Sequence, residues 1–215
     1  MRPLLNSDTL GGREVGPPLT YASPMDEQTS NAEIAAYTVG ELKPHDGPIG
    51  LVDYNPAWST LFQREAQRIR DALGDRIIQL EHVGSTSVPE LAAKPQLDIL
   101  LVVRDSADEP TYLPSLEQHG YLLRIREPNW FQHRMLKGPD TNINLHVFST
   151  GCVEIDRMLT FRDWLRTNAE DRELYDQTKR ELASRTWRHV QNYADAKTEI
   201  VRDILARALA KSAKP

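Results

Sequence analysis

The order of helix-like and strand-like patterns along this 215-residue chain limits the folds that are open to it. A helical pattern after Asn55-Pro56 is followed by two strand patterns, a short helical pattern and three more strand patterns, and the rest is helical. The expected helices are 56–73, 111–119, 155–167, 169–185 and 192–211, and the expected strands are 77–83, 97–103, 121–127, 131–137 and 143–149. This order predicts an α+β fold, in which a mixed β-sheet is packed with helices and followed by a C-terminal helical segment.

The first 47 residues differ from the rest of the chain in composition. Proline and glycine recur there and apolar periodicity is weak, although residues 31–42 suit one short helix or strand. Such a segment buries too little apolar surface to offset the entropy lost on ordering it. We therefore predict a flexible N-terminal arm over 1–47 and one domain over 48–215, with the sheet part at about 48–150 and the C-terminal helices at about 155–211. The arm is a mobile extension or, alternatively, an oligomerisation or regulatory segment.

Charge and cysteine content narrow the classes of function. The chain has 26 Lys and Arg against 31 Asp and Glu, a net charge of -5. Residues 1–47 hold 3 of these basic and 7 of these acidic residues, so the predicted domain is nearly neutral. An acidic chain is not expected to bind long nucleic acids. Cys152 stands alone and excludes an internal disulfide; with neither a membrane span nor a signal peptide evident, we expect a cytoplasmic protein.

A glycine turn after the 77–83 strand has the features of an anion site. Gly84-Ser85 precedes Ser87-Val88-Pro89-Glu90, a capping-box pattern that predicts the start of a helix. Backbone N–H groups and the positive end of the helix dipole would then face an anion. Ser85, Thr86 and Ser87 add hydroxyl donors. The alternative is an ordinary junction between a strand and a helix.

Asp98 is the one charged residue within the most apolar strand, 97–103. An unpaired carboxylate is costly to bury, so a cation, a metal ion or a hydrogen-bond donor should lie beside it. A metal ion that bridges Asp98 to phosphates held at Gly84 and Ser85 is one such partner, and Lys94 is another.

Several separate segments agree with one family in sequence and spacing. They are Glu81-His82-Val83-Gly84-Ser85-Thr86-Ser87-Val88-Pro89, Lys94-Pro95, Asp98-Ile99, Leu145-His146-Val147-Phe148, Phe161-Arg162-Asp163 with Leu165-Arg166, and Tyr175 with Lys179. Through these motifs the chain resembles the GrpB-like family of predicted nucleotidyltransferases, within the DNA-polymerase-β-like nucleotidyltransferase superfamily. The resemblance covers about residues 50–205. Glu90 departs from it, since family members tend to have glycine there.

The resemblance implies a nucleotidyltransferase site that this sequence fills only in part. It implies that Gly84 and Ser85 hold a nucleoside triphosphate and that Asp98 binds Mg²⁺ or another divalent cation during nucleotidyl transfer. A second carboxylate is expected two residues after the first, where this chain has Leu100. A complete two-metal site is therefore not expected.

The resemblance also implies a third carboxylate on a neighbouring strand, but the 143–149 strand offers other side chains there. Asn144 and His146 share one of its faces. His146 is a candidate metal ligand beside Asp98, a candidate base, or a structural histidine. Together these groups suit Mg²⁺ less well than paired carboxylates, because Mg²⁺ prefers hard oxygen ligands. His82 fits a structural role better.

Each C-terminal helical pattern carries a basic residue within its apolar stripe. These residues are Arg162, Lys179 and Lys197. Any one of them could reach water along its own stem. Three in successive helices, beside an anion turn, predict a convergent positive pocket that binds phosphates. Arg157 and Arg134 are weaker candidates.

Three functions remain open for such a site. The first is transfer of a nucleotidyl group from a bound nucleoside triphosphate to a small-molecule or protein acceptor. The second is a non-catalytic module of the same fold that binds a nucleotide or another phosphorylated or acidic small molecule. The third is a non-nucleotidyl transferase or ligase that uses His146 and Asp98. Neither a membrane nor a long nucleic acid is an expected partner, and oligomerisation would involve the N-terminal arm.

Overall fold

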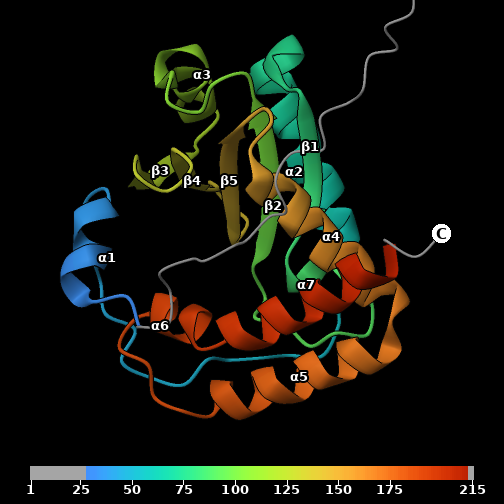
Figure 1. Cartoon of the computed structure of the whole chain (residues 1–215). Coiled ribbons are helices and arrows are strands. Elements are labelled where there is room, and N and C mark those ends of the chain that lie inside the picture. Colours follow the sequence, from blue (N-terminus) through green and yellow to red (C-terminus); the bar gives the residue numbers. More distant parts are fainter. Residues whose placement is uncertain (1–27, 213–215) are drawn as a thin grey trace, which may run out of the picture.

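A five-stranded mixed β-sheet forms the centre of the molecule in the computed structural model, which describes residues 28–212 (Figure 1). The strands are β1 (Gln79–Val83), β2 (Leu97–Val103), β3 (Leu122–Glu127), β4 (His133–Lys137) and β5 (Ile143–Ser149). Their order in the sheet is β1-β2-β5-β4-β3. The central pair β2 and β5 is parallel, and all other neighbours are antiparallel. The predicted α+β fold with a mixed sheet is confirmed.

Helices cover both faces of this sheet. They are α1 (Asn31–Tyr37), α2 (Ala57–Leu73), α3 (Leu113–Gln118), α4 (Val153–Thr167), α5 (Ala169–Ala183), α6 (Val190–Asp195) and α7 (Thr198–Ser212). On one face Ile99 and Leu101 of β2 pack with Ile69 of α2. On the other face Leu100 packs with Ile155 of α4. Asp98 shares the face of Leu100, because side chains alternate along a strand, and it is the second residue of β2. One end of β2 points toward α6 and α7 (Figure 1).

The predicted helix over 192–211 is two helices. The chain turns at residues 196–197, between α6 and α7, so Lys197 precedes α7 instead of belonging to a helical stripe. Tertiary hydrogen bonds hold α6 in its own direction: the Asn192 side chain donates to Thr29 O, and the Asp195 carboxylate accepts from Thr29 N, both at 2.9 Å. These contacts join residues far apart in the chain, which a local pattern does not reveal.

The helix predicted from the capping-box pattern is also absent. Residues 85–87 form one 3₁₀ turn, and residues 88–96 are not helical. Ser87 Oγ donates to Gly84 O at 2.6 Å, and the Glu90 carboxylate accepts from Arg172 of α5 at 2.6 Å. Both capping side chains are therefore engaged elsewhere, and the turn presents no helix N-terminus to an anion.

Residues 28–47 differ from the flexible arm predicted over 1–47, because they are folded against the domain. Ser30 and Glu33 form a capping box at the start of α1. Thr38 pairs with Ile125 of β3, and Gly47 pairs with Trp187 before α6. We call residues 28–47 the N-terminal strap. Residues 1–27 of the predicted arm lie outside the described residues.

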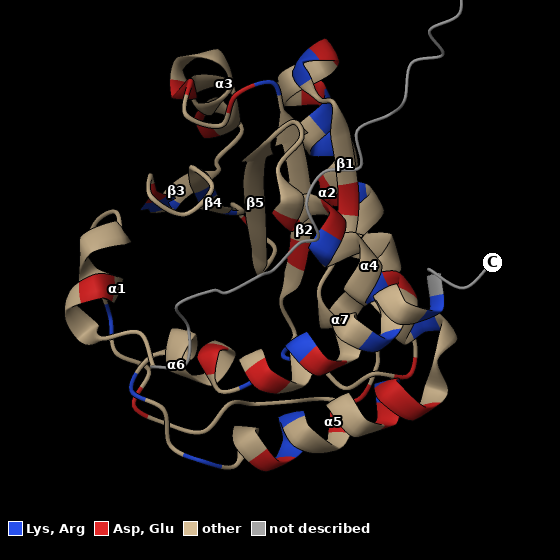
Figure 2. Cartoon of the chain, in the orientation of Figure 1, with Lys and Arg blue, Asp and Glu red and all other residues tan. Residues whose placement is uncertain are grey.

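The surface of the described part carries charges of both signs. Basic and acidic residues lie side by side along α5 and α7 (Figure 2). None of the helices within residues 28–212 has the length and apolar character needed to cross a membrane.

Candidate functional site

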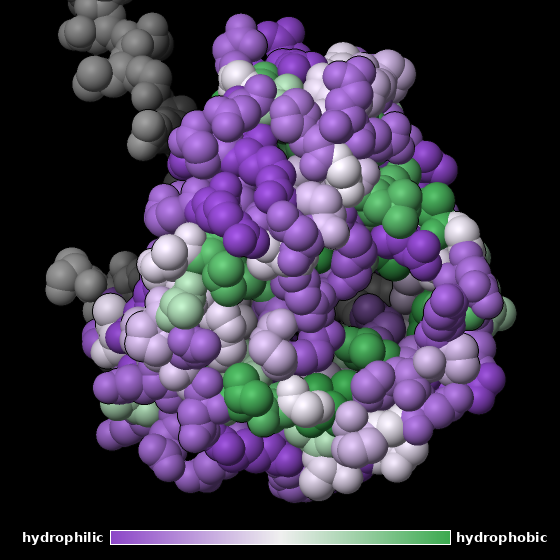
Figure 3. All heavy atoms as spheres, turned by 180° about the vertical axis from the view of Figure 1, so that it is seen from behind, coloured by the Kyte–Doolittle hydropathy of each residue, from purple (hydrophilic) through white to green (hydrophobic). Residues whose placement is uncertain are grey.

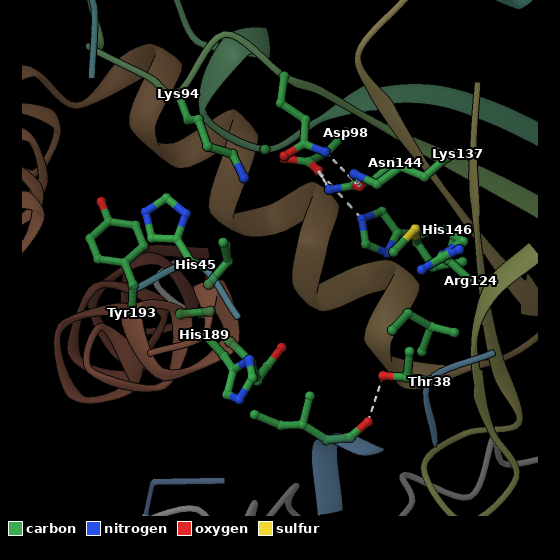
Figure 4. A pocket seen from close by; sticks show the side chains of 18 of the residues that line it. Thr38, His45, Lys94, Asp98, Arg124, Lys137, Asn144, His146, His189 and Tyr193 are labelled. Carbon is green, nitrogen blue, oxygen red and sulfur yellow. Dashed lines mark hydrogen bonds and ion pairs between the residues drawn. The ribbon is translucent and has the colours of Figure 1, made fainter. Parts of the chain in front are cut away.

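A cavity of about 640 Å³ lies between the sheet, the N-terminal strap and the helices α4, α5 and α6. Seen from behind, the surface is hollowed on the side where α1 lies, with apolar residues near the rim (Figure 3). Asp98, Asn144 and His146 approach the cavity from the strands, while Thr38 and His189 lie across from them (Figure 4).

Gly84 lets the turn after β1 pack directly against Asp98. Val83 and Asp98 are partners in the β1–β2 register, so the following residue comes close to the carboxylate. Gly84 has φ 68° and ψ -175°, a conformation that is essentially restricted to glycine. A Cβ at this position would overlap Asp98 Oδ2 and lie 3.0 Å from Asp98 Cβ. Glycine at position 84, which the sequence analysis assigned to a phosphate-binding turn, is thus also needed because the backbone there lies directly against Asp98.

Asp98 is held by donors from β5. Asn144 Nδ2 donates to Asp98 Oδ1 at 2.8 Å, and His146 Nε2 lies 3.5 Å from the same oxygen (Figure 4). Asn144 Oδ1 in turn accepts from Gln96 at 2.7 Å and from Lys137 at 2.5 Å. Burial acts to raise the pKa of Asp98, but the hydrogen bonds from His146 and Asn144 and the charge of Lys94 outweigh it, so its pKa is below the usual value. Asp98 is therefore a carboxylate at neutral pH.

A chain of hydrogen bonds leads from Asp98 into the sheet. His146 Nδ1 lies 3.0 Å from His133 Nε2, and His133 Nδ1 lies 2.6 Å from Glu127 Oε2. Burial lowers the pKa of His133 to about 4, so its ring is neutral at pH 7. His133 Nδ1–H donates a hydrogen bond to the Glu127 carboxylate, and His133 Nε2 therefore accepts one from the Nδ1–H of His146. In the neutral ring His146 Nε2 is then an acceptor, and it donates to Asp98 Oδ1 once the ring carries a second proton.

Five lysines line the cavity: Lys43, which pairs with exposed Glu41, and Lys94, Lys137, Lys179 and Lys197. Burial lowers the pKa of Lys179 to about 7 and the pKa values of Lys137 and Lys197 to about 8, and it also lowers the pKa of Lys94. Lys179 donates to Ala92 O, and Lys137 donates to Asn144.

Two of these lysines are left for a ligand. Within residues 28–212, Lys94 and Lys197 have no side-chain hydrogen bond; Lys197 Nζ lies 3.9 Å from the centroid of the Tyr193 ring. With Asp98 as the neighbouring carboxylate, this part of the cavity carries more positive than negative charge.

The cavity brings together most of the site residues expected from the sequence. Those that line it are Gly84, Ser85, Thr86, Lys94, Asp98, His146, Lys179 and Lys197. Ser87 is directed back to Gly84 O and is not among them.

Arg162 is not part of this pocket, so the prediction that it converges there with Lys179 and Lys197 is wrong. Its guanidinium donates to Glu81 at 2.9 Å, to Asp163 at 2.7 and 3.1 Å, and to His82 O at 3.0 Å. Through Glu81 and His82 these bonds tie α4 to β1.

The other basic candidates and His82 also have structural surroundings. Arg134 donates to Glu109 at 2.5 Å, and Arg157 donates to Glu154 at 2.7 Å. His82 stacks on Phe62 with ring centroids 4.9 Å apart and lies 3.0 Å from Thr86 Oγ1. None of these three candidates lines the cavity.

His133, Glu127 and Lys137 are site residues that the sequence reasoning missed. Arg134 drew attention to one face of the 131–137 segment, with Gln132 and Leu136. The opposite face of β4 carries His133, Met135 and Lys137, all of which line the cavity. Strand alternation alone would have grouped them, but their proximity to His146 depends on the β4–β5 pairing.

The residues present do not fit a site for two metal ions. Leu100 occupies the position of the expected second carboxylate and is fully buried, in a cluster with Val83, Phe148 and Ile155. Within residues 28–212, no three His, Cys, Asp or Glu side chains are grouped so that they could hold a metal ion. A divalent cation at Asp98 stays a prediction.

The fold and the cavity define an α+β protein with a basic, partly enclosed pocket at one end of its two parallel strands. A family model described as GrpB protein matches residues 48–207, and the chain belongs to this GrpB family. It is 61% identical over 192 residues to the UPF0157 protein BH1888 of Halalkalibacterium halodurans, which covers 89% of this chain and 98% of the relative. The UPF0157 protein SCO7215 of Streptomyces coelicolor is 43% identical over 160 residues, covering 74% of this chain and 84% of the relative.

A solved structure agrees with this assignment. The crystal structure of the conserved protein GrpB from Enterococcus faecalis matches with a TM-score of 0.67 and 32% identity, covering 76% of this chain and 99% of that one. The family resemblance predicted from the motifs is therefore confirmed.

Proposed function

We propose that this GrpB-family protein binds a nucleoside triphosphate in the cavity and transfers a nucleotidyl group to a small-molecule or protein acceptor. The observation that carries the proposal is the pair Lys94 and Lys197, whose ammonium groups have no hydrogen bond within residues 28–212 and which line one cavity together with Asp98 and the Gly84 turn. Closely spaced phosphates would supply the hydrogen-bond acceptors that these two ammonium groups lack.

Size and charge both support a phosphorylated ligand. The cavity volume of about 640 Å³ lies within the range of roughly 300–1,000 Å³ common for small-molecule sites. Charge pairs in a partly buried site are screened less than on an open surface. Lys94 and Lys197 would each form charge-assisted hydrogen bonds with phosphate oxygens, and bound phosphate would favour the charged forms of Lys179 and Lys137.

The same side chains suggest how a transfer step proceeds. An acceptor hydroxyl gives its proton to His146 Nε2, and its oxygen forms a bond to the α-phosphorus. The bond from that phosphorus to the departing pyrophosphate breaks, and the ammonium groups of Lys94 and Lys197 stabilise the leaving charge. His133 and Glu127 act as positioning residues, because they keep the proton of His146 on Nδ1.

Two alternatives have observations of their own. A non-catalytic module that binds a phosphorylated or acidic small molecule is favoured by Leu100, which is buried where a metal-binding carboxylate would be needed. A non-nucleotidyl transferase or ligase is favoured by the chain from Glu127 through His133 to His146 and Asp98, because such a base does not depend on a nucleotide.

Calorimetric titration tests the binding part of the proposal. The ligands are ATP, GTP, CTP, UTP and tripolyphosphate, each with Mg²⁺ and with EDTA. We expect binding in both conditions, with at least ten-fold weaker binding in Lys94→Ala and Lys197→Ala. Lys211→Ala is the matched control, since Lys211 is exposed on α7 and outside the cavity. Absence of any binding would refute the proposal, and binding that needs Mg²⁺ and is lost in Asp98→Asn would assign the charge neutralisation to a metal ion.

A transfer assay separates the three functions. Incubation with α-labelled triphosphate and mixed acceptors should label a product in wild type, and His146→Gln should bind triphosphate normally but give no product. Binding without any transfer would support the module. Turnover that needs no triphosphate but is lost in His146→Gln would support the third function.

A further inference from the structure

The cavity has two ends of different chemistry. Lys94 and Asp98 lie at one end, and Thr38 and His189 lie across the cavity from them (Figure 4). The strap contributes Ile34, Tyr37, Thr38, Glu41, Leu42, Lys43 and His45 to the lining, and α6 contributes Val190, Gln191, Tyr193 and Ala194. These segments combine apolar side chains with polar ones, in contrast to the lysines at the first end.

The charged groups of the second end already have partners. Arg124 Nη2 donates to Glu41 O at 2.9 Å, and Glu127 accepts from His133. Glu41 and Lys43 pair with each other at 3.6 Å with both side chains 77% exposed. A phosphate or carboxylate would therefore find few uncommitted charges here, while an uncharged, flat group would bury apolar surface of the wall.

The strap is held as a preformed wall. Val39 N donates to Arg124 O at 2.8 Å, next to the bridge between Thr38 and Ile125 of β3. At its other end, Gly47 pairs with Trp187 before α6. Because the strap is attached to both the sheet edge and the helical part, a ligand does not have to order it, which removes one cost of binding.

We propose that the end of the cavity between the N-terminal strap and α6 binds the nucleoside part of the ligand, a heteroaromatic base with its sugar, and that this wall determines which base is accepted. This inference rests on the proposed function, since it assumes that the phosphates lie at Lys94 and Lys197. Apolar walls with a few polar groups are typical of sites for such organic groups.

The N-terminal strap lies outside the part of the chain that the family model matches. The GrpB family model begins at residue 48 and so excludes the strap. The match to the Halalkalibacterium relative covers 89% of the chain; since residues 48–215 amount to about 78% of it by count, that match reaches into residues 1–47. We expect that relative to share the base preference, which other family members need not have.

The test compares ligands that have the phosphates alone with ligands that also have a nucleoside. In wild type, at least one nucleoside triphosphate should bind ten-fold or more tightly than tripolyphosphate, by calorimetry. Ala194→Trp places a large ring in the second end, because Ala194 lines the cavity. It should reduce that difference to less than two-fold while leaving tripolyphosphate affinity unchanged. Ala36→Trp, on the exposed side of α1, is the matched control.

The outcomes distinguish this inference from the proposed function. If neither tripolyphosphate nor any nucleoside triphosphate binds, the proposed function fails. If tripolyphosphate binds but a nucleoside adds no affinity, or the added affinity survives in folded Ala194→Trp, only the inference about the second end fails. Thermal unfolding checks that Ala194→Trp is folded; Thr38→Phe, which fills the same end from the strap, serves if it is not.

Discussion

Replacement of Gly84 by alanine should destabilise the protein and displace Asp98. The backbone at Gly84 has φ 68° and ψ -175°, and a residue with a side chain pays about 1–3 kcal/mol there. The new Cβ would also overlap Asp98 Oδ2. The two strands cannot move apart to make room, because Val83 and Asp98 are paired in the sheet. Such overpacking lowers the free energy of unfolding by about 1–3 kcal/mol more.

The expected loss of at least about 2 kcal/mol lowers Tm by roughly 4–8 °C in a chain of this length. Scanning calorimetry measures it, and two glycines provide matched controls. Gly74 has φ 57° but open space around it, so Gly74→Ala reports backbone strain alone. Gly50 has neither a positive φ nor a neighbour within 4 Å, so Gly50→Ala should leave Tm nearly unchanged. A Gly84→Ala protein as stable as Gly74→Ala would refute the close approach of Asp98.

Three further predictions concern buried groups. Leu100→Asp removes a fully buried side chain and adds an unpaired carboxylate, so urea unfolding should show a loss of about 4 kcal/mol or more; a stable variant that gains Mg²⁺ binding would contradict this packing. The carboxylate of Glu65 is fully buried and accepts from Tyr121 and Thr141, so Glu65→Gln should lower the free energy of unfolding by about 1–3 kcal/mol. A loss no larger than that of the exposed control Glu90→Gln would argue against this prediction. Burial lowers the pKa values of His82 and His133 to about 4, below the value near 6.5 of the unfolded chain. The unfolded state then binds more protons, so the free energy of unfolding should fall as pH falls from about 6.5 to 4, by up to about 1.4 kcal/mol per pH unit for each histidine. Urea unfolding measured across this range should show a smaller fall in His82→Gln than in wild type. A free energy of unfolding that does not change with pH would contradict the reasoning.

The strands and the long helices were predictable because each is a continuous local pattern. The run of apolar residues at 97–103 became β2 with the same bounds, and 143–149 became β5. The helix 169–185 ends two residues earlier in the structure, as α5. The candidate site was predictable in part where one residue violates its own pattern: a carboxylate in an apolar strand indicated Asp98, and a lysine in an apolar stripe indicated Lys179. Lys197 lines the cavity as well, but from the turn before α7 and not from a helical stripe.

Predictions failed where a side chain had a local and a distant partner to choose between. Ser87 and Glu90 fit a capping box, but Glu90 pairs with Arg172, which is 82 positions away. Arg162 fits an inward stripe, yet it finds Glu81 on a strand that only the fold brings to α4. His133 carries no local anomaly, and it becomes a site residue through its contact with His146 across two strands.

The sequence by itself determined the kinds and order of most elements, the family, and the glycine turn beside Asp98, because these depend on residues that are close along the chain. The tertiary structure decided which cations share the cavity, how Glu127 and His133 orient His146, and that residues 28–47 form a wall instead of a free arm. Those outcomes depend on strand register and on packing between segments that are far apart in the chain. A side chain there has several potential hydrogen-bond partners, tens of residues away, and the local sequence does not indicate which of them it contacts.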